Sequence, residues 1–297
     1  LILVSGFLSE FVLRRGSIEF DTPEGIFASE LARVIVRFRN DASKGRAFSL
    51  RARPLLGHEV ADIVPAYAAF VEPGMQARRI LRLRFFRRGI HSLDLARIET
   101  DFPFALFTKS RLVRAPATFR IWPRIFPIQV SMPSAGHPDE KTKQPIAALS
   151  GEDFFGAREY RPGDPPHRIH WRLSARALRP MVREFQLPRS PAVMVRCIIP
   201  DLDDLAESDR YADTAASVVV AALKAGYAVG LQTHRVHVTP DRGEGHRHRL
   251  LDVLAEEPCS TTAHSGIVSL MPVDAMGQPL GEAMEISPVQ DSGVAPS

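Results

Sequence analysis

Apolar and polar residues alternate in two segments of the first third of the chain. The run LARVIVRFRN places apolar residues at Val34, Val36 and Phe38, and ILRLRF repeats the pattern between residues 80 and 85. A period of two is typical of β-strands that bury one face. Further apolar segments with the lengths of strands lie at Phe48–Arg53, Ile63–Val71 and Ala117–Trp122.

Turn-forming segments separate these predicted strands at short, regular intervals. Pro, Gly and Asp gather at Asp41–Gly45, Pro54–Gly57 and Glu72–Gly74. Several short strands with such spacing predict a small immunoglobulin-like β-sandwich, which we place at residues 17–130.

The pattern changes in the last third of the chain. AVMVRCII, at Ala192–Ile199, is an apolar run with Arg196 as its one charged residue, and it predicts a strand covered on both faces. Ser208–Ala225 has the polar start and alanine-rich periodicity of a helix, and Tyr227–Thr233 predicts a second strand. His246–Ala255 again looks helical. The order strand, helix, strand requires a right-handed crossover and a parallel pair of strands.

The last forty residues show no sustained period. Residues 258–297 contain no Lys or Arg, four acidic residues and many Gly, Ser and Pro residues. We therefore expect a disordered or loosely docked tail, and an α/β domain that is incomplete or completed by a partner.

The densest cluster of aromatic, turn-forming and charged residues lies between the two patterned regions, at Gly151–Phe185. Pro162, Gly163 and Pro166 predict a tight turn, and arginines that can hold carboxylates bidentately surround it. The segment resembles the signature of the DUF58 family at Phe154, Gly156, Arg158, Tyr160, Gly163, Asp164, Arg168, Ile169, Trp171, Ser174, Arg176 and Val182–Phe185.

That resemblance implies an α+β multidomain protein, with an immunoglobulin-like β-sandwich followed by a partial or degenerate von Willebrand A-like α/β domain. The expected divisions are a membrane-proximal segment at 1–16, the sandwich at 17–130, linker and signature at 131–190, the α/β domain at 191–257 and the tail at 258–297. The resemblance also implies a non-enzymatic adaptor that works with a MoxR-type AAA+ ATPase on client proteins.

The signature residues are expected to be structural. Tyr160 and Trp171 would anchor the segment in apolar pockets, so that it joins the sandwich to the α/β layer. Charged side chains would hold its turns, with Arg158, Asp164, Arg168, Arg176, Arg183 and Glu184 as the candidates.

Two enzymatic or metal-binding alternatives remain open. Asp164, His167, His170 and Ser174 offer the groups of a hydrolytic triad, or a histidine metal pair, but no nucleophile elbow and no third metal ligand accompany them. We expect hydrogen-bonded or solvated histidines and no catalytic residue.

The second alternative is an adhesion-type divalent-metal site after the first α/β strand. Asp201, Asp203 and Asp204 supply carboxylates, but the serines that such a loop requires are missing. We therefore expect an acidic partner-binding loop at Asp201–Glu207, with no metal and no cofactor. Cys197 lies in the predicted buried strand and is expected to be a structural thiol.

The basic balance raises nucleic acid as a partner. The chain has a formal net charge of +4, and Arg78, Arg82, Arg84 and Arg88 would share one strand face. Because no nucleic-acid module accompanies them, we expect a solvated edge or contact with anionic lipid, and neither nucleic acid nor a small-molecule substrate. The histidines at 234, 237, 246 and 248 are expected to form an exposed polar stretch.

The chain opens on the apolar run Leu1–Leu13, followed by Arg14 and Arg15. Thirteen residues are too few to span a bilayer, which takes about 20. The resemblance implies the cytoplasmic end of a membrane helix here, and hence a membrane protein whose soluble part faces the cytoplasm. An amphipathic opening helix of a soluble protein is the alternative.

Overall fold

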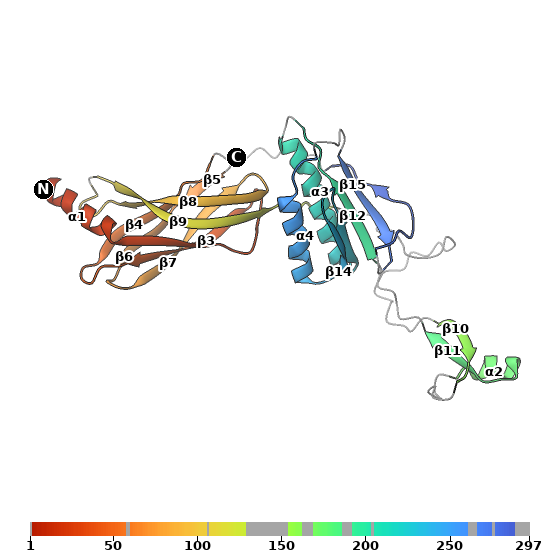
Figure 1. The fold of residues 1–297 in the computed structure, drawn as a ribbon. Coiled ribbons are helices and arrows are strands. Elements are labelled where there is room, and N and C mark those ends of the chain that lie inside the picture. The colour runs from red at the N-terminus through yellow and green to blue at the C-terminus, as the bar shows by residue number, and fades with distance from the viewer. Residues whose placement is uncertain are drawn as a thin grey trace.

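The computed structural model describes residues 2–57, 60–105, 107–128, 154–161, 169–185, 192–202, 205–260, 266–274 and 277–288. These residues form a mixed α/β protein with several β-sheets and four helices. Figure 1 shows three parts, which we call the two-sheet unit (residues 16–122), the α/β unit (residues 192–288) and the arm (residues 154–161 and 169–185).

Two sheets make up the first unit. One has the order β1-β3-β7-β5 and the other β2-β9-β8-β4-β6. The strands are β1 (Gly16–Asp21), β2 (Ile26–Phe27), β3 (Leu31–Asn40), β4 (Ala47–Pro54), β5 (Val60–Val64), β6 (Ala66–Val71), β7 (Gln76–Phe85), β8 (Gly89–Thr100) and β9 (Lys109–Trp122). All pairings are antiparallel except that of β2 with β9.

The alternation in the sequence sets the core of this unit. Val34, Val36 and Phe38 of β3 are buried, and so are the alternate residues Leu81, Leu83 and Phe85 of β7. All six belong to one hydrophobic cluster that both sheets share. The predicted strands are confirmed, although 63–71 divides between β5 and β6 and 117–122 is only the last part of β9. Strands β1, β2 and β8 were not predicted. An immunoglobulin-like arrangement stays a prediction.

Helix α1 (Ile2–Arg14) packs on one end of the two-sheet unit. Val12 and Leu13 are buried in the shared core. Nη1 of Arg111 donates to the backbone oxygens of Leu13 and Arg14, at 3.0 and 3.1 Å, and so satisfies carbonyls at the helix C-terminus. Among the helices described, none combines the length and apolar character needed to cross a bilayer.

The α/β unit is a single sheet of order β14-β13-β12-β15-β16. Its elements are β12 (Ala192–Ile198), α3 (Leu205–Lys224), β13 (Ala228–Gln232), β14 (His237–Asp241), α4 (Glu244–Glu256), β15 (Ile267–Val273) and β16 (Met284–Glu285). Strands β12 and β13 pair in parallel across α3, as predicted. Helices α3 and α4 lie on the side of the sheet that faces the two-sheet unit (Figure 1).

The expectation of a disordered or loosely docked tail from residue 258 is wrong for Ile267–Val273. Strand β15 pairs antiparallel with β12 along its whole length, and Val268, Leu270 and Val273 are buried. The run IVSLMPV has the length and apolar character of a buried strand, but the Gly, Ser and Pro residues around it obscured that signal. The sheet therefore extends beyond the predicted boundary at 257. A von Willebrand A-like arrangement stays a prediction.

The arm is a small, separate assembly of three elements. Strand β10 (Phe154–Glu159) pairs antiparallel with β11 (Met181–Phe185), and helix α2 (Trp171–Ala177) packs on β11. Figure 1 shows the arm lying away from the two larger units.

Candidate functional site

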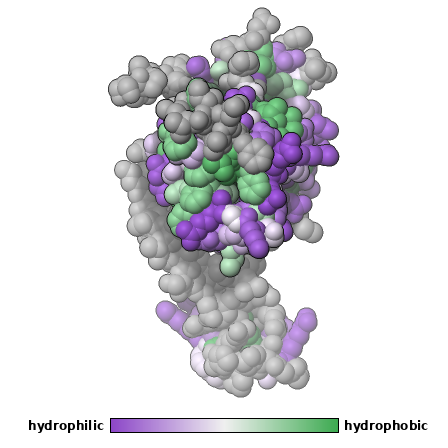
Figure 2. Space-filling view, turned by 90° about the vertical axis from the view of Figure 1, so that its left-hand side faces the viewer, coloured by the Kyte–Doolittle hydropathy of each residue, from purple (hydrophilic) through white to green (hydrophobic). Residues whose placement is uncertain are grey.

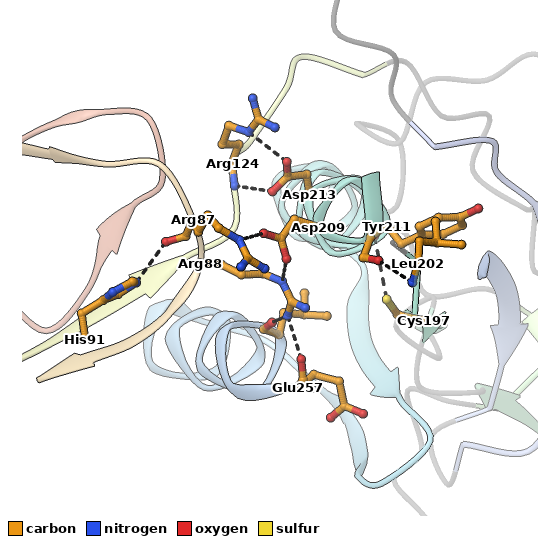
Figure 3. Close-up of polar contacts among 12 residues, drawn as sticks. Arg87, Arg88, His91, Arg124, Cys197, Leu202, Asp209, Tyr211, Asp213 and Glu257 are labelled. Carbon is orange, nitrogen blue, oxygen red and sulfur yellow. Dashed lines mark hydrogen bonds and ion pairs between the residues drawn. The ribbon is translucent and has the colours of Figure 1, made fainter. Parts of the chain in front are cut away.

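The two larger units meet through arginines of one and aspartates of the other, at a contact that we call the junction. Arg87 and Arg88, in the turn between β7 and β8, both reach Asp209 of α3 (Figure 3). The Nε atoms of Arg87 and Arg88 lie 3.0 and 2.9 Å from the two carboxylate oxygens of Asp209. The side chains of Arg88 and Asp209 are 6% and 9% exposed, so this ion pair is buried.

Arg88 also holds the C-terminus of α4. Its Nη1 atom donates to the backbone oxygens of Leu254 and Glu257. The last carbonyls of a helix lack partners within the helix and carry partial negative charge, so a cation at this position satisfies both needs. Nδ1 of His234 lies 2.7 Å from Oε1 of the Glu257 carboxylate.

A second ion pair of the junction lies one turn further along α3. Arg124 donates to Asp213 from its backbone nitrogen at 2.8 Å and from Nε at 3.0 Å (Figure 3). The Asp213 side chain is only 3% exposed. Burial raises the pKa of Asp213 to about 6, and Arg124 opposes that rise without cancelling it.

A third contact involves Trp122, the last residue of β9. Its Nε1 atom donates to Oδ1 of Asp252 on α4 at 2.7 Å, while Arg120 contacts the other oxygen at 3.0 Å. The indole is 5% exposed and packs in the core of the α/β unit, beside Phe27. The two units therefore share apolar packing as well as charge at the junction.

This arrangement fixes the orientation of one unit against the other. The cavity beside Arg87, Arg88, Asp209 and Asp213 holds about 30 Å³, which is room for a water molecule. Arg88 was expected on a solvated arginine stripe and is instead buried here. The sequence signal for this site was weak, since each arginine and aspartate lies in a segment that already had a structural interpretation.

The polar groups of the arm hold its own frame together. The Ser174 hydroxyl accepts from the Met181 amide at 2.8 Å and lies 3.1 Å from the His170 carbonyl oxygen, to which it donates. Nδ1 of His170 accepts from the Leu173 amide at 3.3 Å, and the His170 amide donates to the Met181 carbonyl. These two members of the suggested triad therefore brace the helix against β11.

The prediction that Trp171 lies in an apolar pocket is wrong. Trp171 begins α2 and is 71% exposed, and Leu178, which follows the helix with a φ of 54°, is 93% exposed. Tyr160 is half-buried. The described part of the signature segment lies away from the two units (Figure 1). The junction residues above join these units directly.

Several signature residues lie wholly or partly outside the described residues. Gly163, Asp164, His167 and Arg168 fall there entirely. The structure gives only the backbone for Phe154, Gly156, Arg158, Arg183 and Glu184, all of which lie in the paired strands β10 and β11. Ser174 and Arg176 lie on α2.

The proposed metal loop follows β12. Asp201 is exposed, and the Leu202 amide donates to the Ser208 hydroxyl of α3 at 3.2 Å. Asp203 and Asp204 lie outside the described residues. Within the described ranges, no three His, Cys, Asp or Glu side chains are placed to hold a metal ion. Cys197 is fully buried, and this burial raises the pKa of its thiol to about 12, as a structural thiol requires.

The predicted histidine stretch divides into separate contacts. His234 pairs with Glu257, His248 lies 3.2 Å from Glu24, and Nε2 of His246 lies 2.7 Å from the Val229 carbonyl oxygen. These histidines fasten α4 and its neighbours and are not a single exposed surface.

The chain thus contains two units that are fixed to each other at a charged junction. Its separate arm carries two exposed apolar side chains, Trp171 and Leu178. Residues 156–279 match the family model described as a protein of unknown function, DUF58, and this match confirms the resemblance seen in the sequence. The matched region includes the arm and most of the α/β unit, and the match supports its assignment to the DUF58 family. No curated protein matches the chain.

Proposed function

We propose that this chain is a non-enzymatic, membrane-associated adaptor that works with a MoxR-type AAA+ ATPase in the maturation or assembly of client proteins. The observation that carries the proposal is the exposure of Trp171 and Leu178 on the arm. Covering a large apolar side chain with a partner lowers the free energy of the complex. Tryptophan is also enriched among the residues that dominate protein interfaces.

The frame of the arm supports a docking role. Ser174 and His170 fix the helix that carries Trp171 against β11, so less conformational entropy is lost on binding. The same contacts weigh against hydrolysis, because the Ser174 hydroxyl bonds to backbone atoms and Nδ1 of His170 accepts from a backbone amide.

The end of the two-sheet unit that carries α1 supports membrane association. Figure 2 looks onto this end and shows hydrophobic residues gathered at its centre with hydrophilic residues beside them. Leu8, Phe11 and Phe70 are exposed large apolar residues, and Arg15 and Arg46 lie over the rings of Phe11 and Phe70. Exposed aromatic residues next to cations fit the interface of a bilayer with anionic headgroups.

The test is affinity purification of the tagged protein from its own membranes, with and without ATP, followed by identification of the proteins recovered. We expect ATP-dependent recovery of an AAA+ ATPase with the wild-type protein and its loss with Trp171→Ala. Tyr67→Ala is the matched control, since Tyr67 is another exposed aromatic residue, on the two-sheet unit. Recovery of the tagged protein alone would contradict the proposal.

A further inference from the structure

The outer face of the sheet β1-β3-β7-β5 carries a repeated pattern of arginine and isoleucine. Residues of β3 lie directly opposite residues of β7, and they form three successive rows across the two strands. The rows, which we call the arginine face, are Arg33 with Arg82, Ile35 with Ile80, and Arg37 with Arg78.

This face is open to solvent. Ile35 and Ile80 are 42% and 52% exposed, and Arg33, Arg78 and Arg82 are exposed as well. Two exposed isoleucines thus lie between two pairs of arginines. Contact with water is unfavourable for these apolar side chains, and they offer contact area to a partner.

The two arginine rows differ in how their charge is balanced. Arg37 contacts Asp21 and lies 3.6 Å from Glu19, both on the neighbouring strand β1. Within the part of the chain that the structure describes, no carboxylate lies within 4.0 Å of Arg33, Arg78 or Arg82. Like charges directly opposite each other destabilise a sheet, so the row of Arg33 and Arg82 is held at a cost that an external anion would remove.

We propose that the arginine face binds an acidic, extended segment of another polypeptide. Alternate residues of an extended chain face the same side, with a rise of about 3.3 Å per residue. A segment with carboxylates four residues apart would therefore span from Arg33 to the row of Arg78, and the residue midway between them would lie over the two isoleucines. Strand β1 provides an internal precedent, because its alternate residues Glu19 and Asp21 bring carboxylates to Arg37.

The aliphatic centre distinguishes this partner from nucleic acid. Single strands bind through cationic grooves in which bases stack on aromatic side chains. The middle row here is Ile35 and Ile80, which suits an aliphatic side chain. This surface is separate from the arm, so the inference goes beyond the proposed function and does not depend on an ATPase.

The experiment is fluorescence anisotropy with the full chain and a fluorescein-labelled peptide that contains the sequence Glu-Thr-Val-Thr-Glu. We expect saturable binding that weakens with added salt. The double variant Arg33→Gln/Arg82→Gln should weaken binding by about tenfold or more, because it removes the charge-assisted hydrogen bonds at one end of the face. A peptide with both glutamates replaced by glutamine should not bind.

A matched control is available on the opposite sheet. Arg53 and Arg97 are also exposed and lie directly opposite each other, but the next row there pairs Arg51 with Glu99. Arg53→Gln/Arg97→Gln makes the same change in net charge and should alter the affinity by less than about twofold. Equal losses from both double variants would show general charge attraction and overturn the proposal.

Two further outcomes would also overturn it. One is absence of peptide binding at low salt by folded wild-type protein. The other is binding to vesicles of phosphatidylglycerol, or to a single-stranded oligonucleotide, that depends on Arg33 and Arg82 while the peptide does not bind.

Discussion

Replacing Asp209 with alanine should weaken the junction between the two units. Asp209 is the shared partner of Arg87 and Arg88, and the Arg88 side chain is 6% exposed. Removing one member of a buried ion pair costs about 3 to 5 kcal/mol, because it leaves the other charge buried without compensation. Arg88 keeps its two carbonyl acceptors on α4, and Arg87 is partly exposed, so we expect the lower end, about 3 kcal/mol.

The two tryptophans of the chain provide the assay. Trp122 is buried at the junction and Trp171 is exposed on the arm. A Trp171→Phe background therefore leaves one tryptophan, whose fluorescence reports the junction during unfolding in urea. With a slope of about 2 to 3 kcal/mol per molar urea, Asp209→Ala should lower the midpoint by about 1 M.

The control is Glu72→Ala, which removes an ion pair between Glu72 and Arg46. The side chains of Arg46 and Glu72 are 55% and 40% exposed. An exposed pair of this kind contributes less than about 1 kcal/mol. If Asp209→Ala and Glu72→Ala shift the midpoint equally, the argument that the junction is buried and fixed is wrong.

Three other predictions concern the junction, the arm and the loop after β12. Because burial raises the pKa of Asp213 from 3.8 to about 6, the folded protein binds this proton more tightly than the unfolded protein does. This residue should therefore make stability fall as the pH rises from about 4 to about 6, by up to about 3 kcal/mol. Asp213→Asn should remove that part of the pH dependence, and an unchanged pH slope of the urea midpoints would contradict it. Ser174→Ala should leave the Met181 amide without its acceptor, cost the arm about 1 to 2 kcal/mol and speed amide exchange there; unchanged exchange would refute the bracing role. Added Mg²⁺ should not raise the melting temperature, whereas a rise at saturating metal would restore the adhesion-type site at Asp201.

The strands of the two-sheet unit and the start of the α/β unit could be predicted because their signals are local. A period of two placed Val34, Val36 and Phe38 in the core, and an apolar run broken only by Arg196 placed β12 between two covered faces. Gly226, with a φ of 86°, ends the predicted helix α3 as expected.

The junction could not be predicted in this way, because its contacts join residues far apart in the chain. Arg88 and Asp209 are 121 positions apart, and neither segment shows that the other lies beside it. The prediction that Trp171 is buried failed for a different reason. An aromatic residue in a segment rich in turn formers and charges is expected to be a buried anchor, but Trp171 starts a seven-residue helix that buries none of its residues.

The central claim is that the arm binds an AAA+ ATPase through Trp171. The most direct measurement replaces Trp171 with a photo-crosslinking benzoylphenylalanine in the tagged full chain, irradiates native membranes with and without ATP, and identifies the adducts. We predict an ATP-dependent adduct with an AAA+ ATPase from this position and none from the same probe at Tyr67. An ATPase adduct at Tyr67 but not at position 171, or no ATPase adduct at either position, would contradict the claim.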